Sequence, residues 1–218
     1  MGRNQNVPAA RSQKNIKVWI TLMPLSEPPP FLKTYFEPFR LDYERWAAEI
    51  AKLSLQQTNL VAWSIDDFTH NLKLFTPEYL AKMMKAAHDI NPRLAFVPCC
   101  YYKAITPMFA KIYAPLLDAV LFPYCDESSG GNLKNPDNVE NEINVPRTTR
   151  PGDAKYLDLY ASAHSRLGVT TADYIEKSLR DGLRTADGVM IYTHRALELE
   201  PEKRKVIRQL FREHAGKK

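Results

Sequence analysis

Two adjacent carboxylates, Asp66 and Asp67, follow directly on the apolar run Leu60–Ile65 in the segment LVAWSIDDFTH. The run is apolar on both faces, which is typical of a parallel strand covered by helices. Aspartate is depleted in strands, so the pair marks either the end of the strand or a site placed there. Two close carboxylates repel each other, which raises the pKa of one of them, as a general acid near neutral pH requires. The alternative interpretation of the pair is a helix cap or a loop salt bridge.

Strand-like and helix-like segments alternate along the chain, and these elements must position the carboxylates. Apolar runs rich in β-branched and aromatic residues predict strands at Ile16–Met23, Leu60–Ile65, Leu94–Pro98, Ala119–Tyr124, Tyr156–Ala161 and Gly188–Tyr192. Helical spacing and threonine caps predict helices at Asp42–Leu55, Pro77–Ile90, from Thr106–Pro107 onward, and at Asp137–Ile143, Thr171–Thr185 and Pro201–His214. The pattern is a repeated βα unit.

The repeated unit predicts an α/β protein with a (β/α) TIM-barrel-like fold of about six βα units. The chain holds no GxGxxG or GxxxxGK[ST] motif, the strongest marker of a nucleotide-binding doubly wound sheet. A full barrel has eight units and about 250 residues, so we expect the first two strands to be lacking. We expect 1–15 to be a disordered lead-in, 16–214 the barrel-like domain and 215–218 a tail. The strands should be parallel neighbours in one curved sheet.

The functional groups of such a barrel belong at the C-terminal ends of its strands. Polar and aromatic residues collect at these positions, namely Asp66, Asp67, Tyr101, Tyr102, Asp126, Glu127, His164 and His194. Side chains alternate along a strand, so the small residues Ala62 and Ser64 share a face with Asp66. This alternation favours Asp66 facing the barrel axis and Asp67 reaching the pocket from the loop.

The run WSIDDFTHN…FTPEYL, followed by LAFVPCCYY, resembles the TIM-barrel glycoside hydrolases, and within them the hexosaminidase-type barrels with two adjacent aspartates after the fourth strand. In that group the first aspartate holds the substrate's acetamido group and the second protonates the leaving oxygen. The resemblance therefore implies Asp66 as the polariser and Asp67 as the acid in hydrolysis of a glycosidic bond of a carbohydrate substrate. The specific match lies within residues 63–102. We expect neither a cofactor nor a metal.

Residues after the later strands are further candidates. Glu127, beside Asp126, could form the second half of a two-carboxylate pair or be a solvated loop residue. Asp158 lies inside YLDLY, where an unpaired charge is costly, so it has a partner in the barrel interior or the strand starts late. His164 and His194 follow the last two strands as site residues or as structural ones. Tyrosines that suit either stacking on a sugar or ordinary half-buried packing are Tyr101, Tyr102, Tyr124 and Tyr192.

The composition limits the partners. The net charge of +5 is compatible with a nucleic-acid partner, but much of the excess positive charge lies near the two ends and does not interleave with aromatic residues, so we expect no nucleic-acid partner.

No apolar run approaches the ~20 residues that cross a membrane. The first residues lack the apolar core of a signal peptide, so a cytoplasmic location is the default. Three cysteines without CxxC spacing indicate buried free thiols. Open sheet edges would favour self-association.

Two other functions fit the same pattern. One is a metal-dependent hydrolase in the same barrel, with Asp66 or Asp67, His164 and His194 as ligands, although the HxH and HExxH spacings are absent from the chain. The other is a non-catalytic carbohydrate-binding remnant, which the missing barrel units favour.

Overall fold

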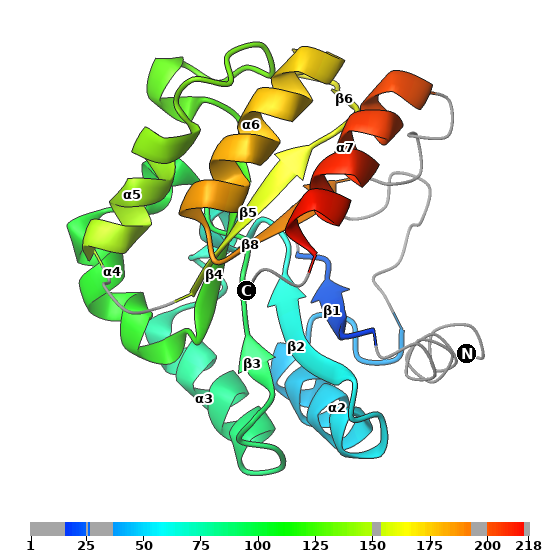
Figure 1. The fold of residues 1–218 in the computed structure, drawn as a ribbon. Coiled ribbons are helices and arrows are strands. Elements are labelled where there is room, and N and C mark those ends of the chain that lie inside the picture. Colours follow the sequence, from blue (N-terminus) through cyan, green and yellow to red (C-terminus); the bar gives the residue numbers. More distant parts are fainter. Residues whose placement is uncertain (1–15, 25, 27–36, 150–153, 193–199, 216–218) are drawn as a thin grey trace. The chain divides into compact units, whose positions relative to one another are not determined.

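The computed structural model describes residues 16–24, 26, 37–149, 154–192 and 200–215 (Figure 1). Packing divides the chain into two compact units. The first contains the described residues up to Cys99 together with Lys111–Ala119, and the second contains Cys100–Ala110 together with the described residues from Val120 onward. Within the described ranges, no helix combines the length and the apolar character needed to cross a bilayer.

The sheet of the first unit is parallel, with the strand order β1-β2-β3. Its strands are β1 (Val18–Leu22), β2 (Leu60–Ile65) and β3 (Ala95–Phe96). Asp42 and Thr76 cap the two main helices, because each side chain accepts a hydrogen bond from the backbone N–H three residues on. The two helices pack on each other. The helices of this unit are α2 (Tyr43–Gln56), η1 (Phe68–Asn71), α3 (Pro77–His88) and η3 (Ala114–Leu116).

Aromatic packing forms the core on one face of this sheet. Trp63 of β2 is fully buried, and its ring centroid lies 4.4 Å from that of Phe96 on β3. Phe68 of η1 meets Phe96 edge-on, with 5.9 Å between the centroids. Because side chains alternate along a strand, Ser64 and Asp66 lie on the opposite face of β2 from Trp63. The aromatic packing thus lies on one face of β2, and Leu60, Ala62 and Ser64 on the other face are buried as well.

The sheet of the second unit has the order β4-β5-β8, and its last two strands are parallel, with Leu157 in register with Val189. Its strands are β4 (Ala119–Tyr124), β5 (Ala154–Tyr160) and β8 (Gly188–Tyr192), and β6 (Ala163–His164) and β7 (Gly168–Val169) form an antiparallel hairpin. Gly182 lets α6 approach β5 closely, because a Cβ there would overlap the Leu157 side chain. The helices are η2 (Tyr102–Ala104), η4 (Glu127–Ser129), α5 (Val139–Thr149), α6 (Ala172–Thr185) and α7 (Pro201–His214), while α4 (Pro107–Tyr113) contains residues of both units.

Most predicted elements are confirmed, several with the predicted bounds, as for β2, β4, β8 and α7. The third strand is shorter than expected: β3 ends at Phe96, two residues before Pro98, which has no N–H to donate to a ladder. Helix α5 begins later and runs further than the predicted helix. The β6–β7 hairpin is absent from the sequence prediction because strands of two residues are too short to show alternation.

The α/β class is confirmed, and so is parallel pairing for β1 with β2, β2 with β3 and β5 with β8. The described strands pair as two three-stranded sheets and the two-stranded β6–β7 hairpin, so the single curved sheet stays a prediction. In this pairing the two-residue β3 is bonded in a ladder with β2 alone. The number of βα units relative to a full barrel stays a prediction. The three cysteines are buried and are not in disulfide bonds, as predicted.

Candidate functional site

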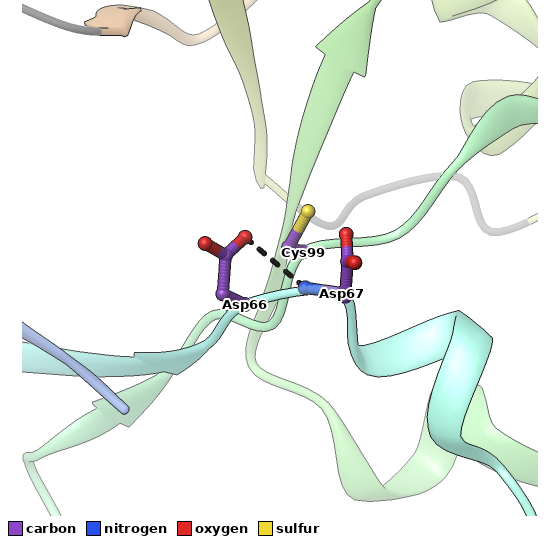
Figure 2. Close-up of side chains that lie close together, drawn as sticks. All are labelled: Asp66, Asp67 and Cys99. Atoms are coloured by element: carbon purple, nitrogen blue, oxygen red, sulfur yellow. Dashed lines mark hydrogen bonds between the residues drawn. The ribbon is translucent and has the colours of Figure 1, made fainter. Parts of the chain in front are cut away.

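Three side chains that could do chemistry meet at the carboxyl end of β2 (Figure 2). Asp66 follows β2, and its N–H donates to Leu22 O of β1 at 2.9 Å. Cys99 follows β3, and its N–H donates to Ile65 O at 3.0 Å, which keeps it beside β2. One carboxylate oxygen each of Asp66 and Asp67 and the Cys99 Sγ lie within 4.8 Å of one another. Figure 2 shows the three side chains pointing the same way, with the thiol between the two carboxyl groups.

A left-handed backbone conformation at Asp67 brings the two consecutive carboxyl groups to the same side. Asp67 has φ 43° and ψ 31°, a region that aspartate enters more readily than most residues. In an extended strand the neighbouring side chains would point to opposite faces. The turn makes Asp67 the N-cap residue of η1, and its N–H donates to Asp66 Oδ1 at 3.1 Å. The two carboxyl groups therefore form one cluster.

Burial raises the pKa of Asp66 above its ordinary value of 3.8, and the nearby charge of Asp67 raises it further. Hydrogen bonds from the Asp67 N–H and the Cys99 thiol oppose this rise without cancelling it. The sequence predicts a raised pKa from mutual repulsion, whereas in the structure desolvation is the larger cause. Asp66 is therefore a more basic carboxylate than a solvated aspartate.

The Asp67 carboxyl is partly covered and has an imidazole beside it. Its side chain is 14% exposed, that of His70 is 48% exposed, and His70 Nδ1 lies 3.6 Å from Asp67 Oδ2. The Asp67 carbonyl oxygen accepts hydrogen bonds from the His70 N–H at 3.0 Å and from Asn71 Nδ2 at 2.9 Å. Sequence reasoning missed His70 and Asn71. Their spacing, three and four positions after Asp67, is the signal that could have found them, because such neighbours meet on a helical turn.

Glu127 and the two tyrosines after β3 belong to the second unit. Tyr101 and Tyr102 are half-buried at the start of η2. Glu127 begins η4, and its Oε2 accepts a hydrogen bond from the Lys103 N–H at 2.9 Å. This bond ties Glu127 to the segment that carries both tyrosines.

The carboxylate of Asp126 organises the loop after β4. Asp126 is fully buried and has a left-handed φ of 50°. Its Oδ2 accepts hydrogen bonds from the side-chain amides of Asn132 at 2.6 Å and Asn135 at 3.2 Å. Its Oδ1 accepts one from the amide of Asn138 at 2.7 Å. Both oxygens are thus engaged inside the protein, which is the arrangement of a structural carboxylate.

Tyr124 and Asp158 are buried residues of the second unit. Tyr124 ends β4, and its hydroxyl donates to Asn135 O at 2.6 Å while its ring stacks on Tyr174. Burial raises the pKa of Tyr124. Asp158 is 6% exposed and lies in register with Met190 of β8. Both side chains are therefore part of the interior of the second unit.

His164 and Tyr192 come together around Tyr160, which sequence reasoning missed. The ring centroid of Tyr160, the last residue of β5, lies 5.5 Å from each of the other two. His164 Nδ1 accepts the N–H groups of the residues two and three positions on, at 3.2 and 3.3 Å, so the neutral ring carries its proton on Nε2. Tyr192 is 43% exposed. His194 lies outside the described residues.

No family model and no curated protein matches this chain. Among solved structures, β-glucuronidase 2 from Bacteroides uniformis is similar with a TM-score of 0.63 at 11% identity, over 88% of this chain and 25% of that chain. A protein assigned as an α-L-fucosidase from Bacteroides thetaiotaomicron has a TM-score of 0.62 at 12% identity, over 94% of this chain and 70% of that chain. A GH18 chitinase from Pseudoalteromonas aurantia has a TM-score of 0.60 at 12% identity, over 96% of this chain and 82% of that chain. The chain spans about a quarter of the length of the β-glucuronidase.

These likenesses define the fold class. The chain has an α/β fold similar to that of TIM-barrel glycosidases. At identities of 11–12% they show the fold alone. One fold hosts many chemistries, so the function has to be argued from the site.

Proposed function

We propose that this chain hydrolyses a glycosidic bond with carboxyl groups at the carboxyl ends of its strands. The observation that carries the proposal is the cluster of Asp66 and Asp67 after β2, on a fold similar to that of TIM-barrel glycosidases. Glycosidases act with pairs of acidic residues. Barrel enzymes place such groups at the ends of their strands. The proposed substrate is therefore a carbohydrate.

The roles of the two aspartates follow from the resemblance to hexosaminidase-type barrels. Asp67 donates its proton to the glycosidic oxygen while the bond between that oxygen and the anomeric carbon breaks. Asp66 accepts a hydrogen bond from the substrate's acetamido N–H, which makes the acetamido oxygen a better nucleophile toward the anomeric carbon. The raised pKa of Asp66 supports this role, because a more basic carboxylate is a stronger acceptor.

Further residues are proposed to serve the same reaction. Tyr192 is suited to stacking on a sugar, because it is 43% exposed and Tyr160 packs against its ring. Glu127 is proposed as an additional catalytic carboxylate. The other proposed sugar-binding residues are Tyr101, Tyr102, Tyr124, Asp158, His164 and His194.

We also propose that the chain represents about six of the eight βα units of a full barrel. In support, β1 and β8 each stand at one end of the strand order of their sheet. Strand edges of this kind pair readily with other chains, so self-association is part of the proposal.

Hydrolysis of a panel of aryl glycosides by the purified chain tests the proposed function. Aryl 2-acetamido-2-deoxyhexosides should be hydrolysed, whereas the matching hexosides with a free 2-hydroxyl should not, because they have no acetamido group for Asp66 to polarise. Failure to hydrolyse any glycoside would contradict the proposal. Sugar binding without turnover would instead identify a non-catalytic carbohydrate-binding protein.

A metal-dependent hydrolase is the second candidate function, and one observation favours it. The oxygens of Asp66 and Asp67 and the Cys99 sulfur lie within 4.8 Å of one another, and carboxylate oxygen and thiolate sulfur are both zinc ligands. This donor set differs from the one with two histidines that the sequence suggests. Metal content and activity before and after chelation decide between the two functions. Activity that a chelator abolishes and Zn²⁺ restores would support the metal enzyme, and activity indifferent to chelation would support the glycosidase.

A further inference from the structure

Asn71 links the backbone of Asp67 to a stretch of the first unit that is distant in sequence. Its Nδ2 donates to Asp67 O at 2.9 Å and to Ser26 Oγ at 2.8 Å. Asn71 is only 9% exposed, and its backbone carbonyl oxygen accepts hydrogen bonds from the N–H groups of Leu74 and Phe75 at 2.9 and 3.0 Å. Through Ser26 the side-chain amide of Asn71 is tied to a residue outside η1, the 3₁₀ helix that begins after Asp67 and ends at Asn71.

We infer that Asn71 is a positioning residue that holds Asp67 in its left-handed conformation, an inference that rests on the proposed role of Asp67 as the acid. A left-handed conformation is unfavourable for residues other than glycine and persists only where surrounding contacts favour it. Asp67 O accepts hydrogen bonds from the His70 N–H within the same turn and from the buried Asn71 side-chain amide. The Asn71 amide also donates to Ser26 Oγ, which lies outside the turn.

Loss of the hydrogen bond from Asn71 would change the direction of the Asp67 carboxyl group. If the backbone at Asp67 relaxed toward an extended conformation, its carboxyl would move to the face of the strand opposite Asp66. The cluster with Asp66 and Cys99 would then be broken. A displacement of about 1 Å at a catalytic group is enough to lower turnover by up to about 10²-fold.

The same unit offers a matched control in Asn91. Asn91 is 8% exposed, its Nδ2 donates to Ser54 Oγ at 2.8 Å, and its Oδ1 accepts the Arg93 N–H at 3.1 Å. It follows α3 instead of β2, and its hydrogen bonds are to Ser54, Arg93, Ala87 and Leu94, which are not part of the aspartate cluster. Asn91→Ala therefore removes a comparable buried asparagine and its serine bond without touching the turn at Asp67.

Amide hydrogen exchange tests the inference without any need for activity. In Asn71→Ala, exchange of the His70 N–H, which donates to Asp67 O, should speed up about tenfold relative to the amides of α3. In Asn91→Ala this ratio should stay unchanged. An unchanged ratio in Asn71→Ala would overturn the inference, whether or not the protein hydrolyses glycosides.

Turnover then shows whether the held conformation matters to the acid. Asn71→Ala should lower turnover of a glycoside with a poor leaving group by about tenfold and that of an activated aryl glycoside by less than about twofold, since only the first needs the proton. In an Asp67→Asn background the same change should have no further effect, because Asn71 acts through Asp67. Equal losses for both substrates, or losses that multiply in the double variant, would overturn the positioning role while leaving the proposed function standing. Absence of glycoside hydrolysis by the wild type would reject the proposed function and, with it, any catalytic use of this position.

Discussion

Asp67 and Asp126 occupy equivalent local positions in the two units. Each lies two residues after a strand, has a left-handed backbone with φ of 43° and 50°, and is the N-cap residue of a 3₁₀ helix. Their carboxylates differ. That of Asp126 is fully buried and engaged by three asparagine amides, whereas that of Asp67 is 14% exposed and lies close to Asp66. The same turn therefore supports a structural carboxylate in one unit and a candidate catalytic one in the other.

This difference predicts that the same substitution costs more stability at Asp126 than at Asp67. Asp126→Asn should lower the free energy of unfolding by about 2–3 kcal/mol, because an amide replaces the acceptor that three amide donors share inside the protein. Asp67→Asn should change it by less than about 1 kcal/mol, because that side chain is partly solvated. Urea unfolding of both variants measures the two effects. Equal effects would contradict the distinction between a structural and a catalytic carboxylate.

Asp66 predicts a pH dependence of stability. Its pKa in the folded chain is raised above 3.8, so between 3.8 and the raised value the folded state holds more protons than the unfolded state. The free energy of unfolding therefore falls as the pH rises through this window. Asp66→Asn removes this contribution, so the stability of the variant relative to wild type should increase with pH across the window and then level off. Urea unfolding at a series of pH values measures the difference, and a difference independent of pH would contradict the raised pKa.

The edge of β8 predicts self-association. Strand β8 ends the strand order of its sheet, and Ile191 in it is half-exposed. The wild-type chain should sediment as a dimer or larger species, and Ile191→Lys should shift it toward monomer, because a charged side chain disfavours edge pairing. Val169→Lys is the control, since it removes an apolar residue that is 59% exposed on the β6–β7 hairpin. A wild-type chain that stays monomeric at all concentrations would contradict the proposal.

Local signals in the sequence account for most of the fold. Thr76 and Thr171 predict helix starts by their cap chemistry, and both side chains make the expected bonds. The apolar runs of β2 and β4 are long enough for their bounds to be read directly. The two-residue strands were either missed or overextended, because so short a segment shows no periodicity.

The site depends on features that the sequence does not show locally. In an extended strand the Asp67 carboxyl would lie on the face opposite that of Asp66, and the left-handed turn at Asp67 changes this. A left-handed conformation is hard to predict from the sequence at a residue other than glycine. The bond between Asn71 and Ser26 joins residues 45 positions apart. Glu142 is 1% exposed and accepts the Ser128 N–H at 2.6 Å, yet it lies in a segment that reads as an ordinary polar helix. Such contacts arise only from tertiary packing.

The central claim is that Asp67 protonates the leaving group of a glycoside. The most direct measurement compares Asp67→Asn with the wild type on two substrates that share one sugar, one with a poor leaving group and one with an activated aryl leaving group. Turnover of the first should fall by about 10²–10⁴-fold, the range for general acid catalysis, and turnover of the second much less, because an activated group departs without a proton. Equal slowing of the two substrates in a folded variant, or a wild type that hydrolyses neither, would contradict the claim.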